Sequence, residues 1–343
     1  MSVAQNAGHF QVDGTDRHKG GEPRTDAPYL AYRKAWADNP ARRIAGEFPL
    51  HLDIESTNRC NLRCEYCTRN NMTDAVVDMD PALFERIIDE GARHGLASIK
   101  LNRRGEPLLH RQLSRFVRYA KDKGVLEVQF NTNAMLLTPD RARSLIEAGL
   151  DRIIFSLDGV DKTAFEAMRP GAVYETVARN IRDFVALRDS MGRSAPLTRV
   201  QMTVSAANVD QVPEYIALWR DTVNKIGFNL RREPMPAGGE KHGLGEQYPC
   251  PQLWQRMAIY CDGETVMCCG DWHKRHVLGN AARDSVRAMW LSEPFARVRD
   301  LHAANRPGDF FLCKDCEYNM HRRDRGIEER LLQAIAQAHG LAE

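Results

Sequence analysis

The sequence predicts an α/β fold in which six β-strands alternate with helices around a parallel sheet. Three observations predict it. β-prone runs recur between residues 50 and 231, apolar residues between them have helical spacing, and Pro or Gly marks most boundaries. The 343 residues are 43% hydrophobic, which is enough for a substantial core. Six such units in series form either an open sheet or a partial barrel.

The elements follow in order after residue 46. Residues 1–46 are rich in Gly, Asp, Lys and His, so we expect a loose lead-in with one short helix near residues 29–36. Asp80-Pro81, Thr138-Pro139 and Pro213 open helices, and Gly124 and Gly149 end two of them. The predicted strands are 50–55, 98–102, 126–131, 152–157, 199–205 and 227–231, and a long amphipathic helix covers 177–187.

A change of composition follows the last of these strands. Residues 234–245 contain two Pro and four Gly, which is typical of a linker. We therefore place a domain boundary near residue 235, between a unit at 47–234 and a Cys-rich unit at 235–326. The Cys-rich unit is expected to be short and irregular, with a hairpin at Asp262-Gly263, and a helix is expected over 327–343.

Charge and hydropathy exclude several function classes. Lys and Arg number 48 against 46 Asp and Glu, so a general nucleic-acid or membrane-surface binder is not expected. No apolar run reaches the roughly 20 residues that cross a bilayer, and residues 1–21 lack the apolar segment of a secretory signal. We therefore expect a cytoplasmic protein in a reducing compartment.

Nine cysteines in such a compartment indicate metal binding or redox chemistry more than disulfides. Three lie at 60–67 and six at 250–316, with none between residues 100 and 249, which indicates two sites. Cys60, Cys64 and Cys67 follow the first strand directly, and three thiolates so spaced suit one face of a cubic iron–sulfur cluster. One iron then stays open for a substrate. The alternative is a zinc knuckle or unrelated buried thiols.

The motif Cys-x3-Cys-x2-Cys, with Tyr66 before the last cysteine, resembles that of the radical S-adenosylmethionine (radical SAM) superfamily. The resemblance covers about residues 48–233 and implies a partial (βα)6 barrel. It also implies a 4Fe–4S cluster whose open iron binds S-adenosyl-L-methionine, and a one-electron donor such as flavodoxin or ferredoxin. In this family one-electron reduction yields a 5′-deoxyadenosyl radical, which removes a hydrogen atom from the substrate.

Polar residues end several predicted strands, at the edge where parallel α/β folds bind ligands. Arg104-Gly105-Glu106-Pro107 is similar to the family's GGEP segment, with Arg104 in place of its first glycine. The side chains of Arg104 and Arg103 would either reach the substrate or the methionine carboxylate, or point to solvent. The resemblance places the following residues near S-adenosylmethionine: Tyr66, Glu106, Asn131 or Asn133, Ser156 and Arg169. Alternatively they are ordinary polar loop residues.

The second group of cysteines resembles the twitch domain, a shortened SPASM domain that holds an auxiliary 4Fe–4S cluster in many radical SAM enzymes. The resemblance implies a small α+β domain with one auxiliary cluster, because no cysteine follows Cys316. Its ligands would be Cys250, Cys268, Cys313 and Cys316, with Cys269 as a possible substitute for Cys268. A structural zinc site with four cysteines is the alternative.

Cys261 and Cys269 are not needed as ligands. They are either small buried residues or hydrogen-atom donors to a substrate radical. His273 and His276 would form a solvated basic turn or touch substrate. The short length and the cysteine pattern of the chain resemble those of 2-deoxy-scyllo-inosamine dehydrogenase and related sugar or aminoglycoside dehydrogenases and epimerases. That resemblance implies oxidation of a carbinol to a ketone in a carbohydrate-like small molecule, with Asp158, Glu233 or Asp271 as the base.

Three other functions stay open. With a cysteine hydrogen-atom donor, the same substrate would be epimerised instead of oxidised. Modification of a ribosomal peptide is a further possibility, although the N-terminal segment looks too short and polar for a peptide-recognition domain. A non-catalytic iron–sulfur or zinc module would leave the polar strand ends unexplained.

Overall fold

The computed structural model describes residues 3–6, 9–13, 24–231, 249–314, 316 and 325–338. In these residues eleven strands form one sheet, in the order β1-β2-β8-β7-β6-β5-β4-β3-β9-β10-β11. The six predicted strands are parallel neighbours at its centre. They are β3 (His51–Ile54), β4 (Ser98–Lys100), β5 (Glu127–Thr132), β6 (Arg152–Ser156), β7 (Leu197–Val204) and β8 (Lys225–Leu230). The α/β class with a partial (βα)6 barrel is confirmed.

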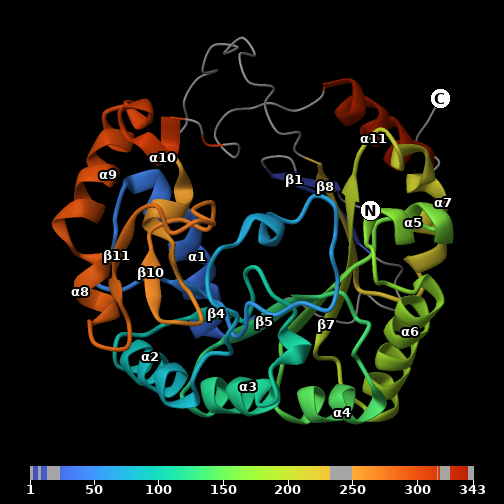
Figure 1. Cartoon of the computed structure of the whole chain (residues 1–343), viewed down its shortest axis with the longest axis horizontal. Helices are drawn as coiled ribbons and strands as arrows, with labels where there is room; N and C mark the ends of the chain where they lie inside the picture. The colour runs from blue at the N-terminus through green and yellow to red at the C-terminus, as the bar shows by residue number, and fades with distance from the viewer. Residues whose placement is uncertain are drawn as a thin grey trace.

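Helices cover the outer side of this curved sheet (Figure 1). They are α2 (Pro81–Arg93), α3 (Leu113–Asp122), α4 (Pro139–Glu147), α6 (Tyr174–Ser190) and α7 (Val212–Trp219). Their starts are as the sequence indicates: the Asp80 carboxylate accepts hydrogen bonds from two backbone N–H groups of α2, and Thr138 caps α4. A short helix that the sequence analysis did not predict, α5 (Lys162–Met168), begins at the capping side chain of Asp161.

The loose N-terminal lead-in was a wrong prediction. Strands β1 (Val3–Asn6) and β2 (His9–Asp13) form a hairpin, and β2 pairs antiparallel with β8. Phe10 and Val12 are buried there, a period-two pattern too short to stand out in the sequence. Helix α1 (Ala27–Arg42) includes the expected 29–36 helix but is twice as long. Its Tyr29 and Tyr32 hydroxyls lie 3.0 Å from Glu127 Oε2 and Ser98 Oγ, on the strands of the barrel.

The C-terminal part continues the sheet of the barrel. Strand β9 (Arg256–Ile259) pairs parallel with β3 and antiparallel with β10 (Glu264–Val266), which pairs with β11 (Val277–Asn280). The predicted hairpin at Asp262-Gly263 is confirmed, and Gly263 adopts a φ of 86°. The linker at 234–245, with the expected domain boundary, lies outside the described residues.

Helices are more extensive at this end than the sequence indicated. Helices α8 (Val286–Trp290) and α9 (Glu293–Ala303) were not predicted, and α10 (Phe311–Lys314) follows them. The expected C-terminal helix is α11 (Arg325–Ala338), which packs against α7 and buries Leu331 and Ile335. Among the described helices, none has both the length and the apolar character that a bilayer span requires.

Candidate active site

The first three cysteines lie on one loop directly after β3, at the carboxyl end of the barrel. A hydrogen bond from Cys67 N to Cys64 O (3.1 Å) closes a turn, and Leu62 N donates to Cys60 Sγ (3.4 Å). Burial raises the pKa of Cys60 to about 11 and also raises that of Cys64, and the neighbouring thiols contribute to both shifts. Three soft sulfur donors therefore share a site where a bare thiolate is disfavoured and a bound metal would compensate its charge.

Glu106 is held against this loop. Its carboxylate accepts hydrogen bonds from Leu108 N (3.1 Å), Thr132 Oγ1 (2.7 Å) and Asn133 N (2.7 Å), and Asn133 Nδ2 donates to Asn61 Oδ1 (2.9 Å). Burial raises the pKa of Glu106. A carboxylate offers about four acceptor sites, so within the described structure one site remains for a further donor.

Gly105 allows this close approach, as its place in the motif indicates. A Cβ atom at residue 105 would lie 2.1 Å from Thr57 O and 2.7 Å from Arg59 O. Glu106 N donates to Arg59 O (2.7 Å), so the strand-end segment lies directly on the start of the cysteine loop. Any side chain at residue 105 would separate the two.

A second polar cluster contacts the same loop through Tyr66 and Cys64. The fully buried Asp158 carboxylate accepts hydrogen bonds from the Tyr66 hydroxyl, Arg169 Nε (2.5 Å) and Thr203 N (2.7 Å). Arg169 Nη1 reaches to 3.9 Å from Cys64 Sγ. Although burial alone would lower the pKa of Arg169, Asp158 raises it, so the guanidinium stays charged beside the thiols. Burial raises the pKa of Tyr66.

Asn131 and Ser156 lie near these clusters but at less specific positions. Asn131 is the penultimate residue of β5, and its backbone N–H donates to Asn102 Oδ1 (2.8 Å). Ser156 ends β6, is half-buried, and pairs with Gln201 in the ladder to β7. Of the residues expected near S-adenosylmethionine, Tyr66, Glu106, Asn133 and Arg169 are thus tied into networks that contact the cysteine loop.

Arg104 has neither of the roles expected for it. Its guanidinium is buried, pairs with Glu55 (Nε–Oε1 2.8 Å) and Asp74 (2.5 Å), and lies over the Tyr260 ring at 4.4 Å. Arg103 Nη2 donates to the Tyr260 hydroxyl (2.9 Å) and to Cys269 O (3.3 Å). Both arginines therefore join β4 to the Cys-rich segment, instead of reaching solvent.

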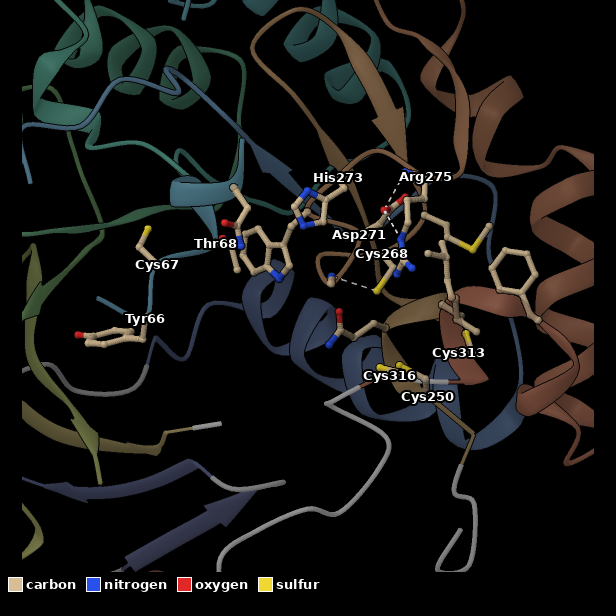
Figure 2. Close-up of a pocket in the computed structure, with 18 of the residues that line it drawn as sticks. Tyr66, Cys67, Thr68, Cys250, Cys268, Asp271, His273, Arg275, Cys313 and Cys316 are labelled. Atoms are coloured by element: carbon tan, nitrogen blue, oxygen red, sulfur yellow. Dashed lines mark hydrogen bonds and ion pairs between the residues drawn. The ribbon is translucent and has the colours of Figure 1, made fainter. Parts of the chain in front are cut away.

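The second cysteine group faces the first across a cavity of about 620 Å³. Figure 2 shows Tyr66 and Cys67 on one side of it, and Cys250, Cys268, Cys313 and Cys316 on the other. Burial raises the pKa of Cys250 and Cys313 to about 12 in each case, and Cys316 contributes to both shifts. Thiols that influence one another in this way lie close together. Cys268 lines the cavity, and this favours it over Cys269 as the fourth sulfur of this group.

The two spare cysteines are not among the described residues that line that cavity, although Cys269 lies next to two residues that do, Cys268 and Gln252. Cys261 is buried and its Sγ donates to Glu55 Oε2 (3.2 Å), while burial strongly raises its pKa. Cys269 Sγ donates to Gln252 Oε1 (2.8 Å) and accepts from Arg256 Nη2 (3.3 Å). Both thiols are thus committed to buried polar partners, which favours the structural interpretation of these residues.

The candidate bases differ in their access to the cavity. Asp158 is enclosed, whereas Asp271 lines the cavity and accepts hydrogen bonds from Arg275 N and His276 N, both at 2.9 Å. Glu233 lies outside the described residues. His273 is exposed at the cavity wall, whereas the His276 ring packs edge-on against Phe310 at 5.1 Å, so only His273 fits the expected solvated turn.

Sequence reasoning missed several residues that build the site. Asn61 and Thr132 hold Glu106 and Asn133, Trp272 lines the cavity, and buried His302 contacts two residues of the second cysteine group. Burial lowers the pKa of His302 to about 4. Of these residues, Asn61 was the easiest to identify from the sequence, because it lies inside the Cys-x3-Cys motif. His302 carries none, because its partners are 52 and 11 residues away.

The donor types at the two sites suit iron–sulfur clusters, which are held by cysteine thiolates. Ligands of a cubic cluster each bind a different iron, so they stand further apart than the ligands of one zinc ion. Three sulfurs at the first site and four at the second fit this chemistry.

Comparison with known proteins agrees with these donor sets. The sequence profile described as "Radical SAM superfamily" matches residues 54–193, and the SPASM profile, described as "Iron-sulfur cluster-binding domain", matches residues 250–317. The "Tungsten-containing aldehyde ferredoxin oxidoreductase cofactor-modifying protein" of Pyrococcus furiosus is 35% identical, over 73% of this chain and 83% of that protein. A GTP 3′,8-cyclase of Chlorobaculum tepidum is 30% identical over half of each chain.

Solved structures share the fold at low identity. The crystal structure of BtrN in complex with AdoMet and 2-DOIA has a TM-score of 0.53 and 18% identity, covering 79% of this chain and 93% of that one. Streptococcus suis SuiB bound to its precursor peptide SuiA has a TM-score of 0.58 and 16% identity, covering 81% and 73%. These likenesses show the architecture alone.

Proposed function

The chain belongs to the radical SAM superfamily, and from that premise we propose that it oxidises a carbinol carbon of a sugar or aminocyclitol to a ketone. Its cofactors are a 4Fe–4S cluster and S-adenosyl-L-methionine, with auxiliary iron–sulfur bound by its SPASM domain. Together they supply a 5′-deoxyadenosyl radical, which removes hydrogen, and an acceptor for the second electron of the oxidation. A flavodoxin or ferredoxin would deliver the priming electron.

One observation carries this proposal: both cysteine groups reach the same cavity. Cys67 lies on one wall, and the four cysteines of the second group lie on the other (Figure 2). A substrate held between them lies beside both the site of hydrogen removal and an electron acceptor. An oxidation needs both, because a carbon radical must lose one more electron to become a carbonyl group.

We assign the cofactor-binding roles from the contacts. Cys60, Cys64 and Cys67 would ligate the first cluster, and the free acceptor site of Glu106 would receive the methionine ammonium group. Asn133 would lie beside it, since its side chain is fixed by Asn61. Arg169 would complement the methionine carboxylate of S-adenosylmethionine, and its hydrogen bond to Asp158 fixes the direction of its guanidinium group. Tyr66, whose hydroxyl donates to the Asp158 carboxylate, would lie against the adenine.

The cavity wall suits a polyhydroxylated substrate. Its polar side chains include Asn70, Asn71, Gln252 and Arg275, and Trp272 adds an aromatic surface. Amides and a guanidinium can bind several hydroxyl groups at once, and this is how polar groups orient a ligand in a mostly apolar pocket. Asp271, the described candidate base that lines the cavity, would accept the hydroxyl proton.

The positions of the spare cysteines support oxidation over epimerisation. A radical epimerase needs a hydrogen-atom donor at the substrate. Neither Cys261 nor Cys269 is among the described residues that line the cavity: Cys261 bonds the buried Glu55, and Cys269 bonds Gln252, whose side chain belongs to the cavity wall. The four cysteines that do line the far wall are assigned to metal. Within the described residues, then, no free thiol is offered to a substrate radical.

Product analysis in deuterium oxide tests this assignment, with 2-deoxy-scyllo-inosamine as the probe. Oxidation predicts a product lighter by two hydrogens, with no solvent deuterium on carbon in the Cys261→Ala and Cys269→Ala variants or in the wild type. An isomer that carries deuterium, and whose formation stops in Cys261→Ala or Cys269→Ala, would establish epimerisation instead. Turnover of a leader peptide, with none of the probe, would indicate peptide modification.

A further inference from the structure

His302 occupies a position between two residues of the second cysteine group. It lies in α9, its residue is 1% exposed, and both ring nitrogens have partners. Cys250 N lies 3.1 Å from Nδ1, and Cys313 Sγ lies 3.3 Å from Nε2. The ring therefore bridges the backbone at one cysteine and the sulfur of another.

These contacts determine which nitrogen carries the proton. A backbone N–H can only donate, so Nδ1 must accept from Cys250 and cannot itself be protonated. The single proton of the neutral ring is then on Nε2, which points at sulfur. His302 is thus an N–H···S donor to Cys313.

Helix α9 holds the ring in that place. Arg299, one turn before His302, is buried and donates to Leu253 O (Nε, 2.9 Å) and Trp290 O (Nη1, 2.9 Å). Leu253 belongs to the short helical turn Pro251–Trp254 that follows Cys250. The helix and the cysteine are therefore fixed relative to each other, and the ring has no solvent to turn towards.

We propose that His302 raises the reduction potential of the auxiliary iron–sulfur cluster through its hydrogen bond to Cys313. This rests on the proposed function, because it takes Cys313 as a ligand. A donor to a ligating sulfur withdraws electron density and stabilises the reduced form of the cluster more than the oxidised form. The residue would thereby favour transfer of the substrate's second electron to the cluster. It is a positioning residue, because it acts through the sulfur of Cys313.

The test uses the Cys60→Ala, Cys64→Ala, Cys67→Ala triple variant, in which only the auxiliary cluster is expected. Its midpoint potential is measured by redox titration followed by electron paramagnetic resonance. His302→Phe removes the donor and keeps a ring, so the potential should shift to a more negative value. His302→Gln can still donate and accept, so it should restore part of the shift. Ala304→Ser, on the exposed end of the same helix, should leave the potential unchanged.

The outcomes separate this inference from the proposed function. A triple variant that binds no iron would overturn the auxiliary cluster itself. A cluster that assembles in His302→Phe with an unchanged potential would overturn the inference alone. Loss of iron in both His302→Phe and His302→Met would also overturn it, because the ring would then be needed for assembly or ligation.

Discussion

Arg104 occupies the position where the related GGEP segment has its first glycine, yet its side chain is only 2% exposed. Its partners Glu55 and Asp74 are 49 and 30 residues away in the chain. No local pattern could have paired them, so the sequence allowed only a choice between substrate and solvent. The cysteine spacing, by contrast, is local, and it identified the first site directly.

Replacing Arg104 should strongly destabilise the fold. In Arg104→Met the fully buried Glu55 carboxylate loses its partner, and breaking such a pair costs about 3–5 kcal/mol. Urea unfolding of the anaerobic protein measures this. Arg115→Ala, at a pair whose arginine side chain is 56% exposed, is the matched control and should cost less than about 1 kcal/mol. Equal free energies of unfolding for the two variants would contradict the buried network.

The adjacent cysteines 268 and 269 should behave differently. In Cys268→Ser the iron content of reconstituted protein should fall from about eight to about four per chain, because one ligand of the auxiliary cluster is lost. Cys269→Ser should keep about eight, since its sulfur bonds Gln252 and Arg256. Iron and sulfide analysis decides between them. The reverse pattern would assign Cys269 as the ligand.

Asp158 should act through Arg169 instead of as a base. Asp158→Asn removes a charge-assisted hydrogen bond worth about 1.5–3 kcal/mol, so the affinity for S-adenosylmethionine should fall roughly ten- to hundredfold. Anaerobic calorimetry gives the dissociation constant, and the iron content should not change. If binding is unaffected while the rate collapses, the carboxylate has a catalytic role.

At the level of elements, periodicity and caps predicted the six central strands and the helices α2, α3, α4, α6 and α7. Several of the misses are short elements. Strand β2 is five residues long and is defined by its pairing with β8, and α8 has five residues. Such short elements are stabilised by distant neighbours, which a single sequence does not show.

Gly105 offers a test at this level. Gly105→Ala places a Cβ atom 2.1 Å from Thr57 O, so the segment after β4 must move, at a cost of about 1–3 kcal/mol. Glu106 moves with it, and S-adenosylmethionine should bind more weakly. Gly308→Ala, where nothing lies within 4 Å, is the control and should match the wild type in melting temperature and affinity. A Gly105→Ala protein with wild-type values would show that this close approach is not needed.

The whole molecule brings the two cysteine groups together through one sheet. Strand β9 pairs with β3, so the segment with the second group begins beside the strand that leads into the first. The sequence indicated two separate sites, whereas in the folded chain cysteines of both groups line one cavity. The identity of the substrate depends on the shape of that cavity and on the arrangement of the side chains that line it. A sequence pattern carries little information about either.

Release of 5′-deoxyadenosine and methionine is the most direct measurement of the central claim. Reconstituted wild-type protein, reduced with dithionite and supplied with S-adenosylmethionine, should form both in equal amounts. The Cys60→Ala, Cys64→Ala, Cys67→Ala variant should form neither while keeping its auxiliary iron. Wild-type protein that binds about eight irons and still releases no 5′-deoxyadenosine would contradict the account.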